Sequence, residues 1–340
     1  MFANAYKGRR VFVTGHTGFK GSWLAAWLTQ MGAVVGGFSD CVPTTPSHFD
    51  AMNLGAHLEA DVRGDIRDRE AMVKAMRQFR PDVVFHLAAQ ALVRKSYEDP
   101  ALTFEANMMG TLNVLEAVRA CPEVQAVVMI TSDKCYRNDE LVWGYRETDA
   151  LGGHDPYSAS KGCTELIAAS YRHAFLAGQG VALATARAGN VIGGGDWTAT
   201  RLVPDVLAAF AAGEPVLLRN PGAIRPWQHV LEPLAGYLAL AQRLATEIDT
   251  PSASWADAWN FGPDARDARS VAWVVERLAR GWGPDARWAV ADTPQVHEAH
   301  TLKLDCSKAH SRLGWHPRWD AETAIARTLA WHQAWRGGGA

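Results

Sequence analysis

Three glycines at three-residue spacing follow a short buried-strand pattern near the start of the 340-residue chain. Val11–Val13 is a β-branched and aromatic run, and Gly15, Gly18 and Gly21 separate it from an amphipathic run that ends at Met31. In this context the first glycine permits a tight turn, the second lets the backbone approach a pyrophosphate, and the third lets the helix pack close to the strand. The stretch therefore predicts dinucleotide binding, although a tight turn without a ligand stays open from these residues alone.

Strands and helices alternate regularly through the first half of the sequence. Near-continuous apolar runs indicate strands that are buried on both faces, as in a parallel sheet. The predicted strands span 11–13, 33–38, 60–66 (a strand and a turn), 82–89, 126–130 and 182–186, the predicted helices span 68–79, 100–120 and 157–176, and residues 41–53 form a long irregular loop. Repeated βαβ units predict an α/β fold with a Rossmann-type doubly wound parallel sheet.

The composition changes after Ala188, and twelve of the fourteen tryptophans lie at or after Trp143. This change predicts a smaller C-terminal α/β lobe that covers the strand ends, where open α/β sheets bind their ligands. We expect residues 8–188 and about 226–262 to form the dinucleotide-binding domain, and residues 189–225 and 263–336 to form the substrate-binding lobe. Most of the tryptophans are expected to be core residues, and Gly193–Trp197 is expected to be a mobile loop.

The overall charge gives no reason to expect a nucleic acid or a membrane as a partner. Thirty-four Lys and Arg residues oppose 36 Asp and Glu residues, for a net charge of −2. No apolar run approaches the roughly 20 residues that span a bilayer. The five cysteines are scattered and odd in number, which favours reduced thiols and a cytoplasmic location.

A polar segment at the end of a predicted strand, Thr131–Tyr136, precedes a helix that carries Tyr157 and Lys161 one turn apart. The pKa of a tyrosine is ordinarily near 10, so a tyrosine needs help to act as a base at neutral pH. A lysine cation one turn away and the positive end of the helix both favour the phenolate. The segment therefore predicts a proton-transfer site, whereas the Tyr–Lys spacing alone also fits two exposed helix residues.

These motifs together resemble the extended short-chain dehydrogenase/reductase family, and within it the CDP-glucose 4,6-dehydratases. The resemblance extends from about residue 8 to 335. It is carried by the glycine turn and by the segments 86–90, 131–136, 187–197, 225–230 and 302–305. It implies a hydro-lyase that converts CDP-D-glucose to CDP-4-dehydro-6-deoxy-D-glucose, for deoxysugar and O-antigen polysaccharide synthesis.

The resemblance also implies a role for each residue of the proton-transfer site. The C4 carbon is oxidised by NAD, water is lost across C5 and C6, and the hydride returns to C6. Tyr157 would be the base for the C4 hydroxyl, and Lys161 would lower its pKa and contact the ribose. Ser132 would hydrogen-bond the C4 oxygen, and Asp133 would protonate the departing C6 hydroxyl.

Lys134 departs from the pattern of the related dTDP-glucose dehydratases, which carry a glutamate at this position as the C5 base. A lysine serves as a base only when it is neutral. We therefore expect Lys134 either to take the C5 proton as a neutral amine or to stabilise the enolate as a cation. A plain surface lysine after a strand is the third interpretation.

NAD is favoured over NADP as the cofactor. Asp40 lies nineteen residues after Gly21, near the spacing at which a carboxylate binds the NAD ribose and repels a 2′-phosphate, although it could also be an ordinary loop aspartate. Lys20 is expected to help neutralise the pyrophosphate. The expected cofactor-binding residues are Gly15, Thr17, Gly18, Phe19, Gly21, Asp40, Asp65, Ile66, Ala88, Gln90, Asn107, Tyr157 and Lys161.

The nucleotide-sugar is expected to contact Asn190, Arg201, Arg225 and Trp227. Arginine suits diphosphate oxygens, and tryptophan can stack on a base or a sugar. Arg225 and Trp227 fit equally well a clasp between the lobes without any ligand contact. No metal ion is expected, because His297–His300 has one residue fewer after its glutamate than the zincin pattern.

Two other functions remain open. One is a different nucleotide-sugar enzyme of the same family, such as a 4-epimerase or a GDP-mannose-type dehydratase. The other is a protein that binds NAD without catalysis, which would have no need of Ser132, Tyr157 and Lys161. The resemblance further suggests a homodimer, or a homotetramer, formed through the helices that begin near Pro100 and Tyr157.

Overall fold

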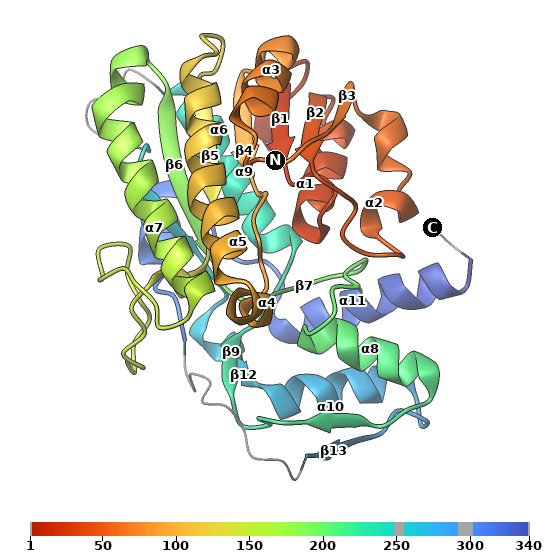
Figure 1. Ribbon diagram of the computed structural model, residues 1–340. Coiled ribbons are helices and arrows are strands. Elements are labelled where there is room, and N and C mark those ends of the chain that lie inside the picture. Colours follow the sequence, from red (N-terminus) through yellow and green to blue (C-terminus); the bar gives the residue numbers. More distant parts are fainter. Residues whose placement is uncertain (1, 248–254, 292–301, 339–340) are drawn as a thin grey trace.

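A seven-stranded parallel sheet forms the centre of the computed structural model (Figure 1), which describes residues 2–247, 255–291 and 302–338. The strand order is β11-β6-β5-β4-β1-β2-β3. Strands β2 and β3 are therefore added on one side of β1, and the later strands, beginning with β4, on its other side. The strands are β1 Arg10–Thr14, β2 Val34–Ser39, β3 Ala60–Arg63, β4 Val83–His86, β5 Ala126–Ile130, β6 Ala182–Ala188 and β11 Ala258–Phe261. The predicted doubly wound parallel sheet is confirmed.

Alternate residues of each strand pack on opposite faces of the sheet. In β1, for example, Val11 and Val13 belong to one apolar cluster and Phe12 belongs to another. Helices α1 (Phe19–Gln30) and α9 (Leu231–Thr246) contribute to the first cluster. The opposite face is covered by three helices, which are α3 Arg69–Phe79, α6 Gly110–Arg119 and α7 Pro156–Tyr171. Both faces are therefore dry, as the apolar strand sequences require.

Most of the predicted elements occur within a few residues of their expected bounds, and two need revision. The predicted loop 41–53 contains a short helix, α2 His48–Ala51, because the Ser47 hydroxyl caps its first turn by accepting a hydrogen bond from the Asp50 N–H. The predicted helix 100–120 consists of α5 Pro100–Phe104, a π-helical turn Glu105–Met109 and α6, and it is preceded by α4 Val93–Glu98.

A smaller lobe lies beside the sheet and has its own apolar core. It contains α8 Leu202–Ala212, α10 Val271–Trp282 and α11 Ala321–Arg336, which form a separate layer in Figure 1. Short strand pairs complete the lobe and join it to the sheet domain: β7 Val191–Ile192 with β10 Gln228–His229, β8 Val216–Leu218 with β13 Trp288–Val290, and β9 Ile224–Pro226 with β12 Ala268–Ser270. The exact division into domains stays a prediction.

The segment Gly193–Trp197, predicted as a mobile loop, is instead closely packed. A Cβ on Gly194 would lie 2.1 Å from the ring of Trp331 on α11, so only glycine fits there. The indole of Trp23 also donates a hydrogen bond to the Gly194 carbonyl at 2.9 Å. This segment therefore fastens α11 to the start of α1.

Candidate active site

The turn between β1 and α1 has the form that dinucleotide binding requires. Gly15 adopts a φ of +75°, and a Cβ there would lie 2.6 Å from the backbone nitrogen of Ala88 after β4. A Cβ on Gly21 would lie 2.0 Å from the Gly15 carbonyl oxygen, so the helix can approach the turn only with a glycine at this position. Gly18 differs, because its Cβ would meet only that carbonyl oxygen, at 3.4 Å. The space beside Gly18 is thus left open by the protein.

The first turn of α1 suits an anion. Gly18 is the N-cap residue and offers no side-chain cap, and no acidic residue occupies the first turn. The N–H groups at a helix N-terminus attract phosphate in this situation. Phe19 begins the helix, and the hydroxyl of Thr17 is already used to donate a hydrogen bond to the Cys41 carbonyl at 2.6 Å.

Two acidic residues at neighbouring strand ends fit the adenosine half of NAD. Asp40 directly follows β2 and is exposed, and its carboxylate accepts the Cys41 N–H at 2.8 Å. Asp65 follows β3, and hydrogen bonds from Arg67 hold the pKa of its carboxyl below the ordinary value. Ile66 is buried under α6, with its carbonyl accepting the Asn113 amide at 3.0 Å. The residues present thus fit a bound dinucleotide, while each individual contact stays a prediction.

Gln90 and Asn107 brace the site with their side chains. Asn107 is buried and joins the loop after β4 to α7, because its amide donates to the Gln90 carbonyl at 3.0 Å and to the Ser160 hydroxyl at 2.8 Å. The Gln90 amide donates to the Thr103 hydroxyl at 2.9 Å. Both residues were predicted to bind the cofactor, and in the protein alone both side chains are hydrogen-bonded to other residues. The backbone N–H of Gln90 also donates to Asn107, at 2.8 Å, so a contact of Gln90 with the cofactor stays a prediction.

The turn that carries the predicted catalytic residues Ser132, Asp133 and Lys134, called the catalytic turn below, follows β5 directly and contains a short 3₁₀ helix, η4 Asp133–Cys135. The Ser132 hydroxyl donates to an Asp133 carboxylate oxygen at 2.9 Å and accepts the Lys134 N–H at 3.2 Å. Asp133 is only 3% exposed, and its second oxygen, Oδ2, has no hydrogen-bond partner among the described residues. Burial raises the pKa of Asp133, against the opposing charges of Lys134 and Arg225. Asp133 can therefore hold a proton for a leaving group.

Tyr157 and Lys161 lie one turn apart at the start of α7, and both are buried. Burial raises the pKa of Tyr157 to about 12, although a hydrogen bond with the Ser132 side chain opposes this shift. Burial also lowers the pKa of Lys161 to about 8, while the charge of Glu165 opposes that shift. The role of Lys161 in lowering the Tyr157 pKa stays a prediction, and in the protein alone the loss of water around the phenol raises that pKa.

A buried ion pair that was not predicted from the sequence contacts the residues on both sides of the catalytic turn. Glu165 of α7 and Arg187 of β6 lie 2.8 Å apart, and both side chains are only 3% exposed. The hydroxyls of Thr131 and Thr185 also donate to Glu165. Arg187 additionally donates to the Tyr136 hydroxyl at 2.7 Å. The network joins β5, β6, α7 and the catalytic turn into one unit.

The predicted substrate residues lie in three different settings. Arg201 is the N-cap residue of α8, is partly exposed, and pairs with Asp196 at 3.2 Å. Arg225 lies close enough to Asp133 for its charge to act on that carboxyl. Trp227 is 3% exposed within the core of the smaller lobe, and its indole donates to the Arg269 carbonyl at 3.0 Å. This burial favours the clasp over ligand stacking for Trp227.

Asn190 follows β6, where it is partly buried. Its backbone carbonyl accepts the N–H of Gln228 at 3.1 Å, which joins the segment after β6 to β10. The neighbouring Gly189 is closely packed, since a Cβ there would lie 2.9 Å from Asp133 Oδ2. The structure thus brings the start of the smaller lobe against the buried carboxyl, and the contact of Asn190 with a substrate stays a prediction.

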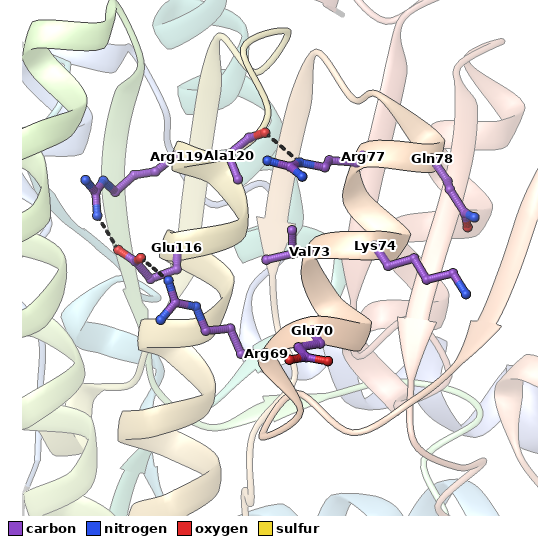
Figure 2. A pocket seen from close by; sticks show the side chains of 9 residues that line it. All are labelled: Arg69, Glu70, Val73, Lys74, Arg77, Gln78, Glu116, Arg119 and Ala120. Carbon is purple, nitrogen blue, oxygen red and sulfur yellow. Dashed lines mark hydrogen bonds and ion pairs between the residues drawn. The ribbon is translucent and has the colours of Figure 1, made fainter.

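A separate open groove of about 920 Å³ lies between α3 and α6. Figure 2 shows that its arginines are engaged within the protein: Arg69 and Arg119 both pair with Glu116, and Arg77 donates to the Ala120 carbonyl. Its lining residues come from α3, α6 and Ala120, and none of them belongs to the catalytic turn. The segment His297–His300 lies outside the described residues. Among those described, no group of three or more His, Cys, Asp or Glu residues is placed to hold a metal ion, and no helix is long and apolar enough to cross a membrane.

The sequence of the chain is similar to those of known nucleotide-sugar dehydratases. The family model "GDP-mannose 4,6 dehydratase" matches residues 12–328 of the chain. The chain belongs to this family. A CDP-glucose 4,6-dehydratase of Salmonella typhimurium is 52% identical over 98% of this chain and 92% of that protein. A dTDP-glucose 4,6-dehydratase of Xanthomonas campestris is 27% identical over 84% of each chain. The resemblance predicted from the sequence is therefore confirmed.

Solved structures of an epimerase and of a dehydratase share the fold of this chain. A UDP-glucose 4-epimerase from Thermus thermophilus in complex with NAD is 28% identical, with a TM-score of 0.78 over 95% of this chain and 99% of that chain. A dTDP-glucose 4,6-dehydratase from Streptomyces venezuelae, solved with NAD bound, is 22% identical, with a TM-score of 0.81 over 97% and 98%. The second likeness supports the fold alone.

Proposed function

We propose that the protein is an NAD-dependent hydro-lyase that converts CDP-D-glucose to CDP-4-dehydro-6-deoxy-D-glucose. The observation that carries the proposal is the 52% identity, over nearly the whole chain, to a CDP-glucose 4,6-dehydratase. The NAD-bound epimerase of the same fold and the open glycine turn support the choice of cofactor.

Each step needs a group that the site provides. Bound NAD supplies a hydride acceptor, later a hydride donor, and a positively charged ring that favours the phenolate. Tyr157 takes the proton of the C4 hydroxyl, while Ser132 hydrogen-bonds the C4 oxygen. The resulting ketone acidifies the C5 hydrogen. Asp133, whose pKa burial raises, gives its proton to the departing C6 hydroxyl. Lys134, partly buried beside Asp133, acts on the C5 proton or on the enolate.

A 4-epimerase is the nearest alternative, and Asp133 argues against it. An epimerase needs the tyrosine and the cofactor, but it has no leaving hydroxyl to protonate. A buried carboxyl with an unpartnered oxygen is costly to keep, and it is useful where water must be expelled. The experiment described next also distinguishes two further alternatives, which are a different sugar nucleotide as the substrate and NAD binding without catalysis.

The test is incubation with CDP-glucose and NAD in deuterated water, followed by mass spectrometry of the sugar nucleotide. Loss of one water with gain of one deuterium, and no lasting NADH, is the expected result. An unchanged mass would point to epimerisation or to another sugar nucleotide. If a panel of sugar nucleotides also failed to react, binding without catalysis would replace the proposal.

We further propose that the protein is a homodimer, or a dimer of such dimers, formed through the helices of residues 100–119 and 156–176. Large apolar side chains on these helices support this proposal: Leu166 is 61% exposed and Met109 is 48% exposed. A Leu166→Glu variant should elute as a monomer in size-exclusion chromatography with light scattering.

The free cysteines of the described chain are compatible with the proposed cytoplasmic location.

A further inference from the structure

His16 lies in the turn between β1 and α1, directly after Gly15, and its side chain is fully buried. Both of its ring nitrogens have a partner. Nδ1 lies 2.9 Å from the hydroxyl of Ser39, the last residue of β2, and Nε2 lies 2.8 Å from a carboxylate oxygen of Asp61 on β3. One imidazole therefore joins the glycine turn to both strands on this side of the sheet.

The surroundings of His16 fix the orientation of its ring. A Cβ on Gly37 of β2 would lie 2.3 Å from the imidazole, so the strand can pass the ring only with a glycine at this position. The ring of Phe49 on α2 meets the imidazole edge to face, with the two centroids 5.6 Å apart. The hydrogen bonds of His16 are thus made by a ring that packing holds in place.

The partners of His16 assign the direction of each hydrogen bond. An ionised carboxylate only accepts, so the Nε2–H group donates to Asp61. Burial lowers the pKa of His16, although the hydrogen bond to Asp61 opposes this shift. The ring is therefore neutral near pH 7, and Nδ1 accepts the hydroxyl proton of Ser39. The same hydroxyl oxygen accepts the N–H of Thr17 at 3.4 Å.

Asp40 lies between two residues that the glycine turn holds. Ser39 precedes it and bonds to His16, while the carbonyl of Cys41, which follows it, accepts the hydroxyl proton of Thr17 at 2.6 Å. The N–H of Cys41 in turn donates to the Asp40 carboxylate at 2.8 Å. The carboxylate is exposed, yet its backbone is fastened to the turn on both sides.

We propose that His16 is a positioning residue that acts through Ser39 and holds the Asp40 carboxylate in place for the adenosine ribose of NAD. One dinucleotide has to reach both points, with its pyrophosphate at the glycine turn and its ribose hydroxyls at the carboxylate. A carboxylate held there also repels the 2′-phosphate of NADP. His16 thus controls the preference for NAD without touching the cofactor. The inference rests on the NAD binding of the proposed function and on none of its chemical steps.

The test compares the dissociation constants of NAD and NADP, measured by calorimetry on the full-length chain freed of bound nucleotide. Both cofactors carry the same pyrophosphate, so general damage to the glycine turn weakens both and leaves their ratio unchanged. Asp40→Asn is the reference and should lower the preference for NAD by about tenfold or more. Ser39→Ala keeps the bond of His16 to Asp61 and should lower the preference about fivefold. The control His173→Gln, on the exposed π-helical turn after α7, should keep the wild-type ratio.

Two variants of His16 separate its two contacts. His16→Asn keeps an acceptor near the place of Nδ1, whereas His16→Gln keeps a donor near the place of Nε2. We expect His16→Asn to retain most of the preference for NAD, because it can still bond to Ser39. His16→Gln should lose about fivefold. In the background of Asp40→Asn, His16→Gln should not change the ratio further, since both substitutions remove the same contact.

Three outcomes would overturn the positioning role, provided that thermal melts show folded variants. The first is a wild-type ratio in both Ser39→Ala and His16→Gln. The second is a wild-type ratio in Asp40→Asn, and the third is an equal effect of His16→Gln with and without Asp40→Asn. A wild-type enzyme that prefers NAD but does not convert CDP-glucose would instead refute the proposed reaction and leave this inference standing.

A second measurement locates the proton on His16 in the absence of cofactor. Long-range proton–nitrogen correlation NMR of the labelled protein distinguishes the two neutral tautomers of a histidine, and the loss of a signal in His16→Gln assigns it. We expect the proton on Nε2 between about pH 6 and pH 8. A proton on Nδ1 would reverse the hydrogen bond to Ser39 and contradict the arrangement proposed here.

Discussion

Glu165 of helix α7 and Arg187 of strand β6 form an ion pair with a 2.8 Å separation, and Thr131, directly before the catalytic turn, donates a hydrogen bond to Glu165. Burial alone raises the pKa of Glu165, but the charge of Arg187 and hydrogen bonds from Arg187, Thr131 and Thr185 outweigh burial and lower it. A buried ion pair of this kind holds its elements in fixed register only while both partners are present. The pair thus fixes the helix of Tyr157 against the strand end.

Removal of one partner should destabilise the protein strongly. A Glu165→Gln variant leaves the Arg187 charge buried without its counter-ion, and we expect it to lower the free energy of unfolding by about 3–5 kcal/mol. Urea unfolding followed by tryptophan fluorescence measures the change. Arg243→Met, which removes a more exposed pair with Glu247, serves as the control and should cost less than about 1 kcal/mol. Equal losses in the two variants would contradict a structural role for the buried pair.

The same pair predicts how the stability of the protein depends on pH. Because the folded-state pKa of Glu165 lies below its ordinary value of 4.5, the unfolded chain binds a proton at this residue more readily than the folded protein. The contribution is therefore fully present above about pH 4.5 and is lost as the pH falls through the folded-state pKa. Urea unfolding between pH 3 and 7 should show the gap between wild type and Glu165→Gln narrowing below pH 4.5. A constant gap would show that Glu165 contributes through packing rather than charge.

Much of the fold could be predicted because it follows from local patterns. Strand β1 and its glycine turn are encoded in consecutive residues. The four-residue helix α2 was missed because its main local signal is a single N-cap serine, Ser47. The catalytic turn could be located because the carboxyl ends of parallel strands meet at one edge of a sheet.

Other features depend on contacts between distant parts of the chain. Glu165 and Arg187 are each unremarkable in the sequence, and only the packing of α7 on β6 makes them a buried pair. Lys20 meets Tyr237 across 217 residues of sequence, so its surroundings could not be inferred from the glycine motif. The raised pKa of Tyr157 likewise reflects burial, which the spacing of Tyr157 and Lys161 does not encode.

Two glycines of the first turn should respond differently to alanine. A methyl group on Gly18 meets only the Gly15 carbonyl oxygen at 3.4 Å, so Gly18→Ala should change the free energy of unfolding by less than about 1 kcal/mol. It should weaken NAD binding at least about tenfold, because the methyl occupies the space through which the backbone approaches the pyrophosphate. Gly21→Ala forces a 2.0 Å contact and should destabilise the fold by about 1–3 kcal/mol or more. Thermal melts and calorimetric NAD titrations separate the two effects, and wild-type NAD affinity in Gly18→Ala would be evidence against the site.

Ser132 should control the first chemical step through Tyr157. Its hydrogen bond opposes the effect of burial on the phenol, so Ser132→Ala should raise the pKa of Tyr157 further above its usual range. We expect NADH formation in a single turnover to slow by about tenfold or more, corresponding to the loss of one hydrogen bond to a charged group. The alkaline rise of the rate should also move to higher pH. The control Ser311→Ala changes an exposed serine whose hydroxyl donates to the Ser307 carbonyl, and it should retain the wild-type profile. An unshifted profile in Ser132→Ala would remove Ser132 from this role.

Trp227 and Arg201 should separate lobe stability from substrate binding. Trp227 is enclosed in the core of the smaller lobe, so Trp227→Ala should cost about 3–5 kcal/mol of stability. Arg201 is partly exposed at the start of α8 but pairs with the buried Asp196, so Arg201→Met should lower the melting temperature, though by less than Trp227→Ala does. It should nevertheless weaken binding of CDP by about 10- to 100-fold through the loss of a charge-assisted hydrogen bond to the diphosphate. Calorimetric titration of CDP into each folded variant gives the comparison. Weaker CDP binding by a folded Trp227→Phe variant, with Arg201→Met unaffected, would reverse the two assignments and return Trp227 to a stacking role.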